Sequence, residues 1–264
     1  EFRMKLLTLN CHSWIEKNQL EKIKYLAQVI KEKQYDVIAL QEVNQSIEKS
    51  IVSGDIKEDN FVYLLNKELQ ELGEISYTYV WDFSHIGYDI YEEGLAILTK
   101  HKIEDIDKFY ITKSSEKTFY KSRKIIKCSI MINNKKINFF TCHLGWWNDE
   151  DEPFKNQVDN LMNKVDGLSF IMGDFNNNAM IRNEGYDYLI SKGLIDTYNI
   201  ALEKDNGITV NGEIAGWEGK KESKRLDIIF TNKNAKVKRS NVIFNDINKS
   251  IISDHYGVEI DVEI

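Results

Sequence analysis

The feature that most constrains the fold is a strand–helix–strand pattern near the start of the chain. Residues 5–9 form an apolar run that ends at Asn10, and residues 36–40 form a second run that leads to Glu42. Between them, residues 16–33 carry apolar side chains at helical spacing, namely Leu20, Ile23, Ala27 and Ile30. A helical crossover makes its two strands parallel. The pattern therefore predicts an α/β fold with Asn10 and Glu42 at one sheet edge, where such sheets bind ligands.

The rest of the chain continues this alternation. Amphipathic patterns predict helices over 61–72, 153–165 and 186–192. Apolar and β-branched runs predict strands over 77–81, 94–99, 103–111, 124–132, 137–144, 168–172, 226–231, 237–244 and 256–264. Asn133 and Asn134 are typical of a hairpin turn, and the long polar stretch 199–224 is typical of a functional loop. Helices that bracket two strand-rich halves predict two packed sheets, each covered outside by helices.

Length and composition favour one domain. The 264 residues are 42% hydrophobic, enough to bury a core, and they contain a single proline and no repeat. We expect residues 1–3 to be a cloning remnant ahead of Met4, which leaves 4–264 as the domain. The three cysteines are odd in number and widely spaced, so they indicate a reducing compartment rather than a disulfide framework.

Charge and hydropathy narrow the choice of partners. No signal-peptide core follows Met4, and no apolar run approaches the roughly 18–20 residues of a membrane span. We therefore expect a cytoplasmic protein without a membrane partner. The net charge of −7 does not attract a phosphate backbone, which argues against nucleic acid as a partner. No sequence feature indicates an obligate protein partner.

A polar motif follows the apolar run at 168–172. Asp174 and Asn176 come directly after Gly173 and are two residues apart, so both can point the same way from an extended backbone. A carboxylate and a carboxamide at a strand end can steer a water and stabilise a charged oxygen. Gly, Asp and Asn are also ordinary turn formers, so the motif needs support from elsewhere in the chain.

Further polar residues interrupt the ends of other predicted strands. His143, like Asn10 and Glu42, has an ordinary structural explanation when taken alone. Asp227 lies in an apolar strand, where an unpaired carboxylate is costly, and His255 is the obvious partner.

Taken together, these side chains match a chemistry. Glu42, Asp254 and Asn10 offer hard oxygen ligands, which suit Mg²⁺ or Mn²⁺ rather than zinc. A divalent ion, two histidines and an Asp/Asn pair are what phosphate-ester hydrolysis requires.

Six short motifs, in order, resemble those of the endonuclease/exonuclease/phosphatase superfamily. They are Thr8-Leu9-Asn10, Leu40-Gln41-Glu42-Val43, Thr141-Cys142-His143-Leu144, Gly173-Asp174-Phe175-Asn176, Arg225-Leu226-Asp227 and Ser253-Asp254-His255. The resemblance covers nearly the whole chain. It implies a four-layer α/β/β/α sandwich of two mixed sheets and a Mg²⁺-dependent phosphoesterase. Stretches such as 84–88, 91–96 and 205–210 resemble bacterial sugar-phosphate phosphatases of the maltose 6'-phosphate type.

The resemblance assigns a role to each motif residue. Glu42, with Asn10 and Asp254 directly or through water, is expected to hold the metal. Asp174 is expected to orient the attacking water, while Asn176 and His143 stabilise charge on the phosphoryl oxygens. His255, oriented by Asp227, serves as base or charge stabiliser, and the choice of base between Asp174 and His255 stays open.

The leading hypothesis is a phosphomonoesterase acting on a phosphorylated sugar. A monoester carries nearly two negative charges, so it needs an added cation, for which Arg123 is the candidate. Trp146 and Trp217 are expected to wall the sugar site with Asn148 nearby, and Trp147 to reach its rim. The main alternative is a phosphodiesterase of the same superfamily, either a nuclease or a sphingomyelinase-like enzyme. A catalytically silent binding module is the alternative from another class, and the retained polar residues argue against it.

Overall fold

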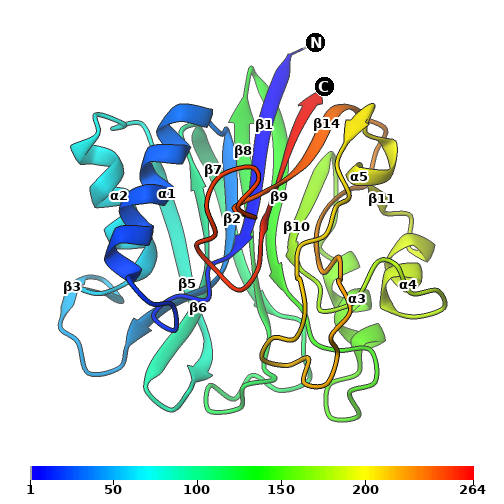
Figure 1. Ribbon diagram of the computed structural model, residues 1–264, viewed down its shortest axis with the longest axis horizontal. Helices are drawn as coiled ribbons and strands as arrows, with labels where there is room; N and C mark the ends of the chain where they lie inside the picture. The colour runs from blue at the N-terminus through cyan, green and yellow to red at the C-terminus, as the bar shows by residue number, and fades with distance from the viewer. Residues whose placement is uncertain (1) are drawn as a thin grey trace.

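Two β-sheets packed face to face form the centre of the molecule, and helices cover the outer face of each sheet (Figure 1). The computed structural model describes residues 2–264. Glu1, part of the expected remnant, lies outside the described residues, whereas Arg3 already begins the first strand. The arrangement confirms the predicted α/β/β/α sandwich.

The first sheet has seven strands. Across the sheet they are β12 (Glu203–Lys204), β14 (Lys236–Ile243), β15 (Gly257–Glu263), β1 (Arg3–Asn10), β2 (Val37–Ser46), β6 (Tyr91–Thr99) and β5 (Thr78–Gly87). β1 and β2 are parallel and are joined through α1 (Gln19–Lys33), which confirms the predicted strand–helix–strand unit.

The second sheet has six strands. In spatial order they are β11 (Ile195–Asp196), β13 (Asp227–Thr231), β10 (Ser169–Asp174), β9 (Lys135–His143), β8 (Lys124–Ile132) and β7 (Lys102–Tyr110). Here β9 and β10 are the parallel pair, and α3 (Phe154–Met162) connects them. Outside both sheets lies a short ribbon of β3 (Ile51–Ser53) and β4 (Ile56–Lys57).

Three apolar layers hold the sandwich together. Between the sheets, Phe139 and Phe170 stack with ring centroids 5.7 Å apart. Leu26 and its neighbours fill the layer between the seven-stranded sheet and the helices α1 and α2 (Phe61–Glu71). Val158 belongs to the layer between the six-stranded sheet and the helices α3 and α4 (Gly185–Ser191). Each fully buried aliphatic or aromatic side chain contributes about 1.5–3 kcal/mol. The short helix α5 (Thr197–Ile200) lies against β13 and β14.

The structure corrects several local predictions. Leu20 is 57% exposed, because the buried stripe of α1 runs through Leu26 and Val29 instead. Pro153 precedes α3 as its N-cap rather than opening the helix. β2 does not end at Glu42 but continues to Ser46. The predicted hairpin at 133–134 is confirmed, since both asparagines adopt the positive φ that a two-residue turn demands.

No helix within residues 2–264 combines the length and the apolar character needed to cross a bilayer.

Candidate active site

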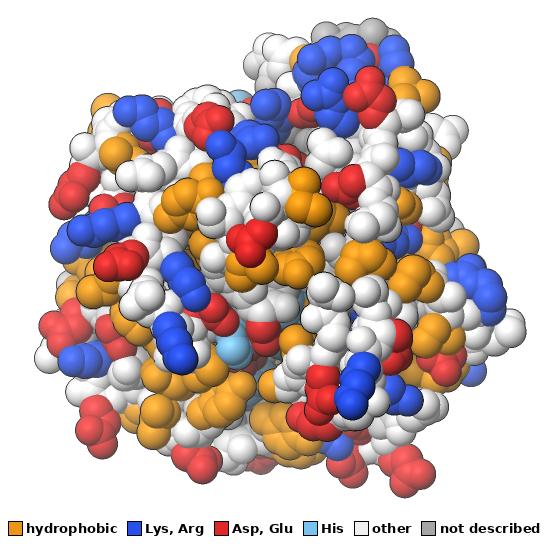
Figure 2. Space-filling view, viewed as in Figure 1, with side chains coloured by type: hydrophobic (Ala, Val, Ile, Leu, Met, Phe, Trp, Pro, Cys, Tyr) orange, Lys and Arg blue, Asp and Glu red, His pale blue; other side chains and the backbone are white. Residues whose placement is uncertain are grey.

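The parallel strands of both sheets end on the same side of the sandwich, away from the two chain ends (Figure 1). A cavity of about 260 Å³ opens there. The predicted residues that line it are Glu42, Arg123, His143, Trp146, Asp174, Asn176, Asp254 and His255. In the space-filling view, a histidine is visible among acidic side chains in a depression near this end (Figure 2). The sequence motifs therefore converge on one site.

A β-bulge turns Glu42 into the cavity. The register between β2 and β6 shifts between Leu40 and Val43. Gln41 and Glu42 therefore lie opposite a single residue of β6. Glu42 has a φ of 48°, a conformation that costs a non-glycine residue about 1–3 kcal/mol. Bulges commonly re-aim side chains beside active sites. The sequence prediction of a strand end was wrong here, because a bulge leaves no simple trace in hydrophobic periodicity.

Asn10 lies behind the cavity and connects two of its carboxylates. Its Nδ2 donates to Glu42 and, at 3.0 Å, to Asp174, while its Oδ1 accepts the backbone N–H of His12 at 3.1 Å. Asn10 is fully buried. These bonds hold the Glu42 and Asp174 carboxylates beside the cavity, and the role of Asn10 toward a metal stays a prediction.

The register of the six-stranded sheet places three predicted residues side by side. Asp174 at the end of β10 pairs with His143 on β9 and with Asp227 on β13. The His143 Nε2 lies 3.5 Å from the Asp174 Oδ2. Gly173 permits this close approach, because a Cβ there would lie 2.0 Å from the Cys142 carbonyl oxygen.

Asn176 is held by a local turn and by a distant tryptophan. Its backbone N–H donates to the Asp174 Oδ1 at 2.9 Å, which closes a turn around the motif. Its Nδ2 donates to the Leu144 carbonyl at 2.8 Å, and its Oδ1 accepts the Trp217 indole N–H at 3.1 Å. The two side-chain bonds fix which end of the carboxamide is the donor.

His255 lies between two carboxylates. Its Nδ1 is 2.8 Å from the Asp227 Oδ2, as the sequence predicts, and its Nε2 is 3.5 Å from the Asp174 Oδ2. Burial lowers the pKa of His255, but the charges of Asp227 and Asp174 raise it more, so that the pKa lies well above its ordinary value. The two carboxylates therefore favour the cationic form of the imidazole.

Glu93 is a residue that sequence reasoning missed. From β6, its Oε2 lies 3.1 Å from the His85 Nε2 and 3.7 Å from the His143 Nδ1. Burial raises the pKa of Glu93, but the two histidines bring it well below the usual range. The signal was available, since an acid beside the apolar run 94–99 needs a partner for the same reason as Asp227 does.

The acidic side of the cavity fits a hard divalent cation. Glu42 and Asp254 both present carboxylates to it. Burial raises the pKa of Glu42, and the neighbouring charges of Glu93 and Asp254 contribute to the rise. Bound Mg²⁺ or Mn²⁺ would offset this repulsion and would find the oxygen donors that it prefers. Glu42, His143 and Asp174 also bring ligand atoms within 4.8 Å of one another.

Arg123 provides the positive side of the cavity. It is only 4% exposed, yet its Nε and Nη1 have no hydrogen-bond partner among the described residues. The guanidinium lies over the Trp146 ring, 5.4 Å from the centroid. A buried cation without a carboxylate partner is costly, so Arg123 brings an uncompensated positive charge to the cavity lining.

The other predicted sugar-site residues are more dispersed. Trp217 is half-buried and contacts Asn176, outside the cavity lining. Asn148 is exposed and does not line the cavity. Trp147 packs against Phe154 and Tyr188 beside α3, so the prediction that it reaches the rim was wrong. Large aromatics are buried on average, and their spacing in sequence does not reveal which face they take.

Three further residues join the lining without having been predicted. His12 has its Nδ1 2.5 Å from Glu16 and its Nε2 3.6 Å from Asp254. Tyr88 and Tyr120 are more than half exposed at the mouth. His12 and Tyr120 lie in connections outside the sequence motifs, whereas Tyr88 ends the stretch 84–88, to which the sequence assigns no role.

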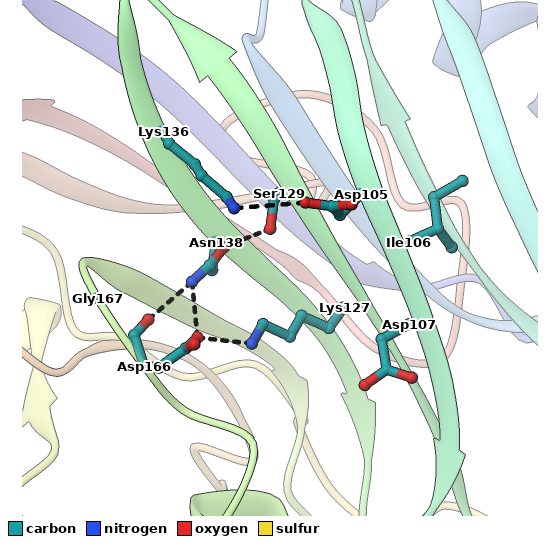
Figure 3. A pocket seen from close by; sticks show the side chains of 9 residues that line it. All are labelled: Asp105, Ile106, Asp107, Lys127, Ser129, Lys136, Asn138, Asp166 and Gly167. Atoms are coloured by element: carbon teal, nitrogen blue, oxygen red, sulfur yellow. Dashed lines mark hydrogen bonds and ion pairs between the residues drawn. The ribbon is translucent and has the colours of Figure 1, made fainter.

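A second hollow of about 380 Å³ lies on the face of β7, β8 and β9 (Figure 3). Lys127 pairs with Asp166 at 2.6 Å and Lys136 with Asp105 at 3.3 Å. Because these charges compensate each other within the hollow, it lacks the open cation that Arg123 gives the first cavity.

Comparisons with known proteins agree with the fold and the motifs. Residues 15–255 match the endonuclease/exonuclease/phosphatase family. A search of curated proteins gives no significant match. A solved protein of this family from Leptotrichia buccalis C-1013-b is 44% identical, with a TM-score of 0.93 over 99% of this chain and 100% of that one.

Two more distant structures share the fold. A mannosyl-6-phosphatase from Bacteroides thetaiotaomicron VPI-5482 is 17% identical, with a TM-score of 0.70 over 99% of this chain and 100% of that one. Truncated TDP2 from Caenorhabditis elegans is 19% identical, with a TM-score of 0.67 over 100% and 98%. The chain belongs to the endonuclease/exonuclease/phosphatase family, whose members hydrolyse phosphate esters.

Proposed function

We propose that this protein is a metal-dependent phosphomonoesterase whose substrate is a phosphorylated sugar. The observation that carries the proposal is the buried Arg123 guanidinium, which has unpartnered N–H groups in the cavity that Glu42, Asp174 and His255 also line. A monoester phosphate has nearly twice the charge of a diester at neutral pH, so a second cation favours the monoester.

The polar residues of the cavity divide into three tasks. Glu42 and Asp254 would hold the metal, which when bound neutralises phosphate charge and polarises the phosphorus–oxygen bonds. Asp174 orients the attacking water, since it lies between His143 and His255 at the centre of the polar network. The two imidazoles and the Asn176 amide donate to the phosphoryl oxygens, where negative charge increases during hydrolysis.

The rim supports a sugar as the leaving group. Tyr88, Tyr120 and Trp146 give the cavity aromatic surfaces next to its acidic floor. Such surfaces suit the apolar C–H face of a sugar ring, while carboxylates and amides accept its hydroxyls. The mannosyl-6-phosphatase with the same fold is an example of this substrate class on a related scaffold.

A substrate panel tests the proposal. The protein is assayed with glucose 6-phosphate, mannose 6-phosphate, maltose 6'-phosphate, p-nitrophenyl phosphate and bis-p-nitrophenyl phosphate, with Mg²⁺, with Mn²⁺ and with EDTA. We expect phosphate release from at least one sugar phosphate, loss of activity in EDTA and a preference for the monoester of the nitrophenyl pair. A preference for the diester would overturn the proposal and favour the phosphodiesterase alternative.

Arg123→Ala sharpens the test. We expect kcat/KM for p-nitrophenyl phosphate to fall about 10²-fold or more, and that for the diester to fall much less, because only the monoester has the second charge. Arg182→Ala serves as the matched control, since Arg182 is an exposed arginine outside the cavity lining. Equal losses on both substrates would leave Arg123 with a structural role.

A further inference from the structure

Lys224 is a fully buried lysine whose ammonium bonds only to backbone carbonyls. Its exposed fraction is 0%. Its Nζ donates to the carbonyl oxygens of Gly212 at 2.9 Å, Lys220 at 2.7 Å and Glu222 at 2.8 Å. An ammonium has three N–H donors, so all of them are used. Among residues 2–264, no carboxylate lies within ion-pair distance of it, although lysine is almost never fully buried unless it is paired.

The three carbonyls belong to one loop. Residues 211–223 connect Val210 to Lys224, which form an isolated antiparallel bridge at the neck of the loop. Side chains along this loop are mostly exposed, so a packed core does not hold it. Short-range bonds within the loop, such as Trp217 N–H to the Ile214 carbonyl and Ser223 Oγ to Asn211, shape individual turns. Lys224 is the residue that ties three separate points of the loop together, and the Trp217 ring centroid lies 5.7 Å from its Nζ.

The tip of the same loop reaches the catalytic cavity at two points. The Trp217 indole N–H donates to the Asn176 Oδ1 at 3.1 Å. Gly216 packs on the edge of Trp146, where an added Cβ would come within 2.9 Å of the ring, and Gly216 lines the cavity. Trp146 in turn lies under the Arg123 guanidinium. The loop therefore contacts Asn176, which lies next to the proposed water-orienting Asp174. It also contacts Trp146, which supports the proposed phosphate-binding Arg123.

We propose that Lys224 is a positioning residue whose ammonium acts as an internal cation, closing the 211–223 loop so that Trp217, together with the Leu144 carbonyl, fixes the orientation of the Asn176 amide. A lone ion bound by carbonyl oxygens would organise a loop in the same manner, and the lysine supplies that charge covalently. The effect on catalysis rests on the proposed phosphatase function, whereas the anchoring of the loop does not.

Limited proteolysis tests the anchoring without any assay of activity. Lys220 is exposed in the loop, and trypsin can cleave after it once the loop opens. We compare the wild type with Lys224→Met, which keeps the apolar stem but removes the ammonium, and with Lys221→Met, which removes an exposed lysine of the same loop. All three proteins keep the Lys220 site. We expect cleavage there to be at least about tenfold faster in Lys224→Met only.

Kinetics and chemical rescue test the link to catalysis. With p-nitrophenyl phosphate, which has no sugar, we expect kcat of Lys224→Met to fall about 10²-fold with little change in KM, because a catalytic donor is misplaced. Lys221→Met should match the wild type. In Lys224→Ala, propylammonium replaces the missing atoms and should restore part of kcat, whereas tetramethylammonium, which has no N–H, should not.

The possible results are distinct. Wild-type proteolysis and kcat in Lys224→Met would overturn the proposal, and faster cleavage with unchanged kcat would overturn its catalytic half. If the wild type hydrolyses no phosphate ester, the proposed function fails while proteolysis still decides the anchoring. Should Lys224→Met fail to fold, Trp217→Phe keeps an aromatic ring but removes the indole N–H together with the pyrrole ring that carries it. Its kcat should fall without faster cleavage, and an unchanged kcat would refute the link to Asn176.

Discussion

Asp227 and Glu93 perform the same task on opposite sides of Asp174. Asp227 holds His255 at 2.8 Å, and Glu93 lies 3.7 Å from His143. Each histidine then presents its Nε2 to the Asp174 carboxylate at 3.5 Å. A carboxylate beside an imidazole orients the ring, and the charge of Asp227 also favours the cationic form of His255. In the proposed reaction both histidines would face a phosphoryl oxygen.

Replacing Asp227 with Asn should lower kcat by about 10³- to 10⁴-fold, because the neutral amide neither supports the imidazolium nor selects its tautomer. Steady-state hydrolysis of p-nitrophenyl phosphate measures this. Thermal unfolding of the same sample is needed, since Asp227 is buried in a strand. A folded and fully active Asp227→Asn protein would remove Asp227 from the site.

At the residue scale, the sequence predicts which residues belong to the site better than it predicts where their side chains point. Asp227 and His255 were paired correctly, because a carboxylate in an apolar strand must find a partner. For Asn10, the sequence predicts a role at the metal, directly or through water, but it does not predict the bonds of its amide to Glu42 and Asp174. Which end of an amide points where depends on neighbours far away in the chain, and a single sequence does not display them.

At the scale of elements, the bulge of β2 is stabilised by a tryptophan from two strands away. Trp81 on β5 crosses Gly94 on β6, and its indole N–H donates to the Val43 carbonyl at 2.9 Å. Val43 follows Glu42 directly. Gly94 leaves the space for this crossing, since a Cβ there would lie within 2.7 Å of the indole and 2.3 Å of the Asp82 carbonyl.

Gly94→Ala should therefore destabilise the fold by about 1–3 kcal/mol, the usual cost of overpacking. It should also weaken metal-dependent activity, because the displaced indole no longer fixes the residue beside Glu42. Denaturant unfolding and metal titration measure the two effects. Gly87→Ala is the control for stability, since the nearest atom to its added Cβ is at an ordinary 3.4 Å. An unchanged midpoint for Gly94→Ala would contradict the crowding argument.

Element types were largely predictable and long-range contacts were not. Hydrophobic periodicity located α1, α2 and most strands because each buries one face in a layer of the sandwich. For the loop at 211–223, the sequence offered only its amino-acid composition as a guide. The hydrogen bonds of Lys224 and Trp217 that hold the loop form only in the folded chain. The sugar contact of Trp217 stays a prediction, and its bond to Asn176 could not be foreseen from the sequence.

At the scale of the whole molecule, the site requires both sheets. Glu42 and Asp254 come from the seven-stranded sheet and its connections, while His143, Asp174 and Asp227 come from the six-stranded sheet. Gln41 joins the two at the back, with its Nε2 donating to Thr141 at 3.1 Å. The geometry of the site therefore depends on how the two sheets pack. Because carboxylates repel one another, a site that crowds them together lowers the stability of the fold.

Glu42→Gln exposes this cost. Glu42 has a raised pKa when folded, so its ionised form destabilises the metal-free protein above its ordinary titration range. We expect the variant to have a higher Tm than the wild type in EDTA, yet to lose the Tm increase that Mg²⁺ gives the wild type and at least about 10²-fold of the activity. Differential scanning calorimetry with and without metal measures both. A wild-type response to Mg²⁺ in the variant would show that Glu42 is not a ligand.

The order of strands in the seven-stranded sheet has a consequence for protein synthesis. β15 lies between β1 and β14, so the sheet joins strands made early and late, whereas residues 102–231 provide the whole of the six-stranded sheet. All strands of the six-stranded sheet are therefore synthesised before β15, whereas the seven-stranded sheet cannot be completed until β15 is present. Asp254 and His255 emerge only just ahead of β15. A chain cut before Gly257 should therefore lack both the strand that joins β1 to β14 and the support that β15 gives to Asp254 and His255.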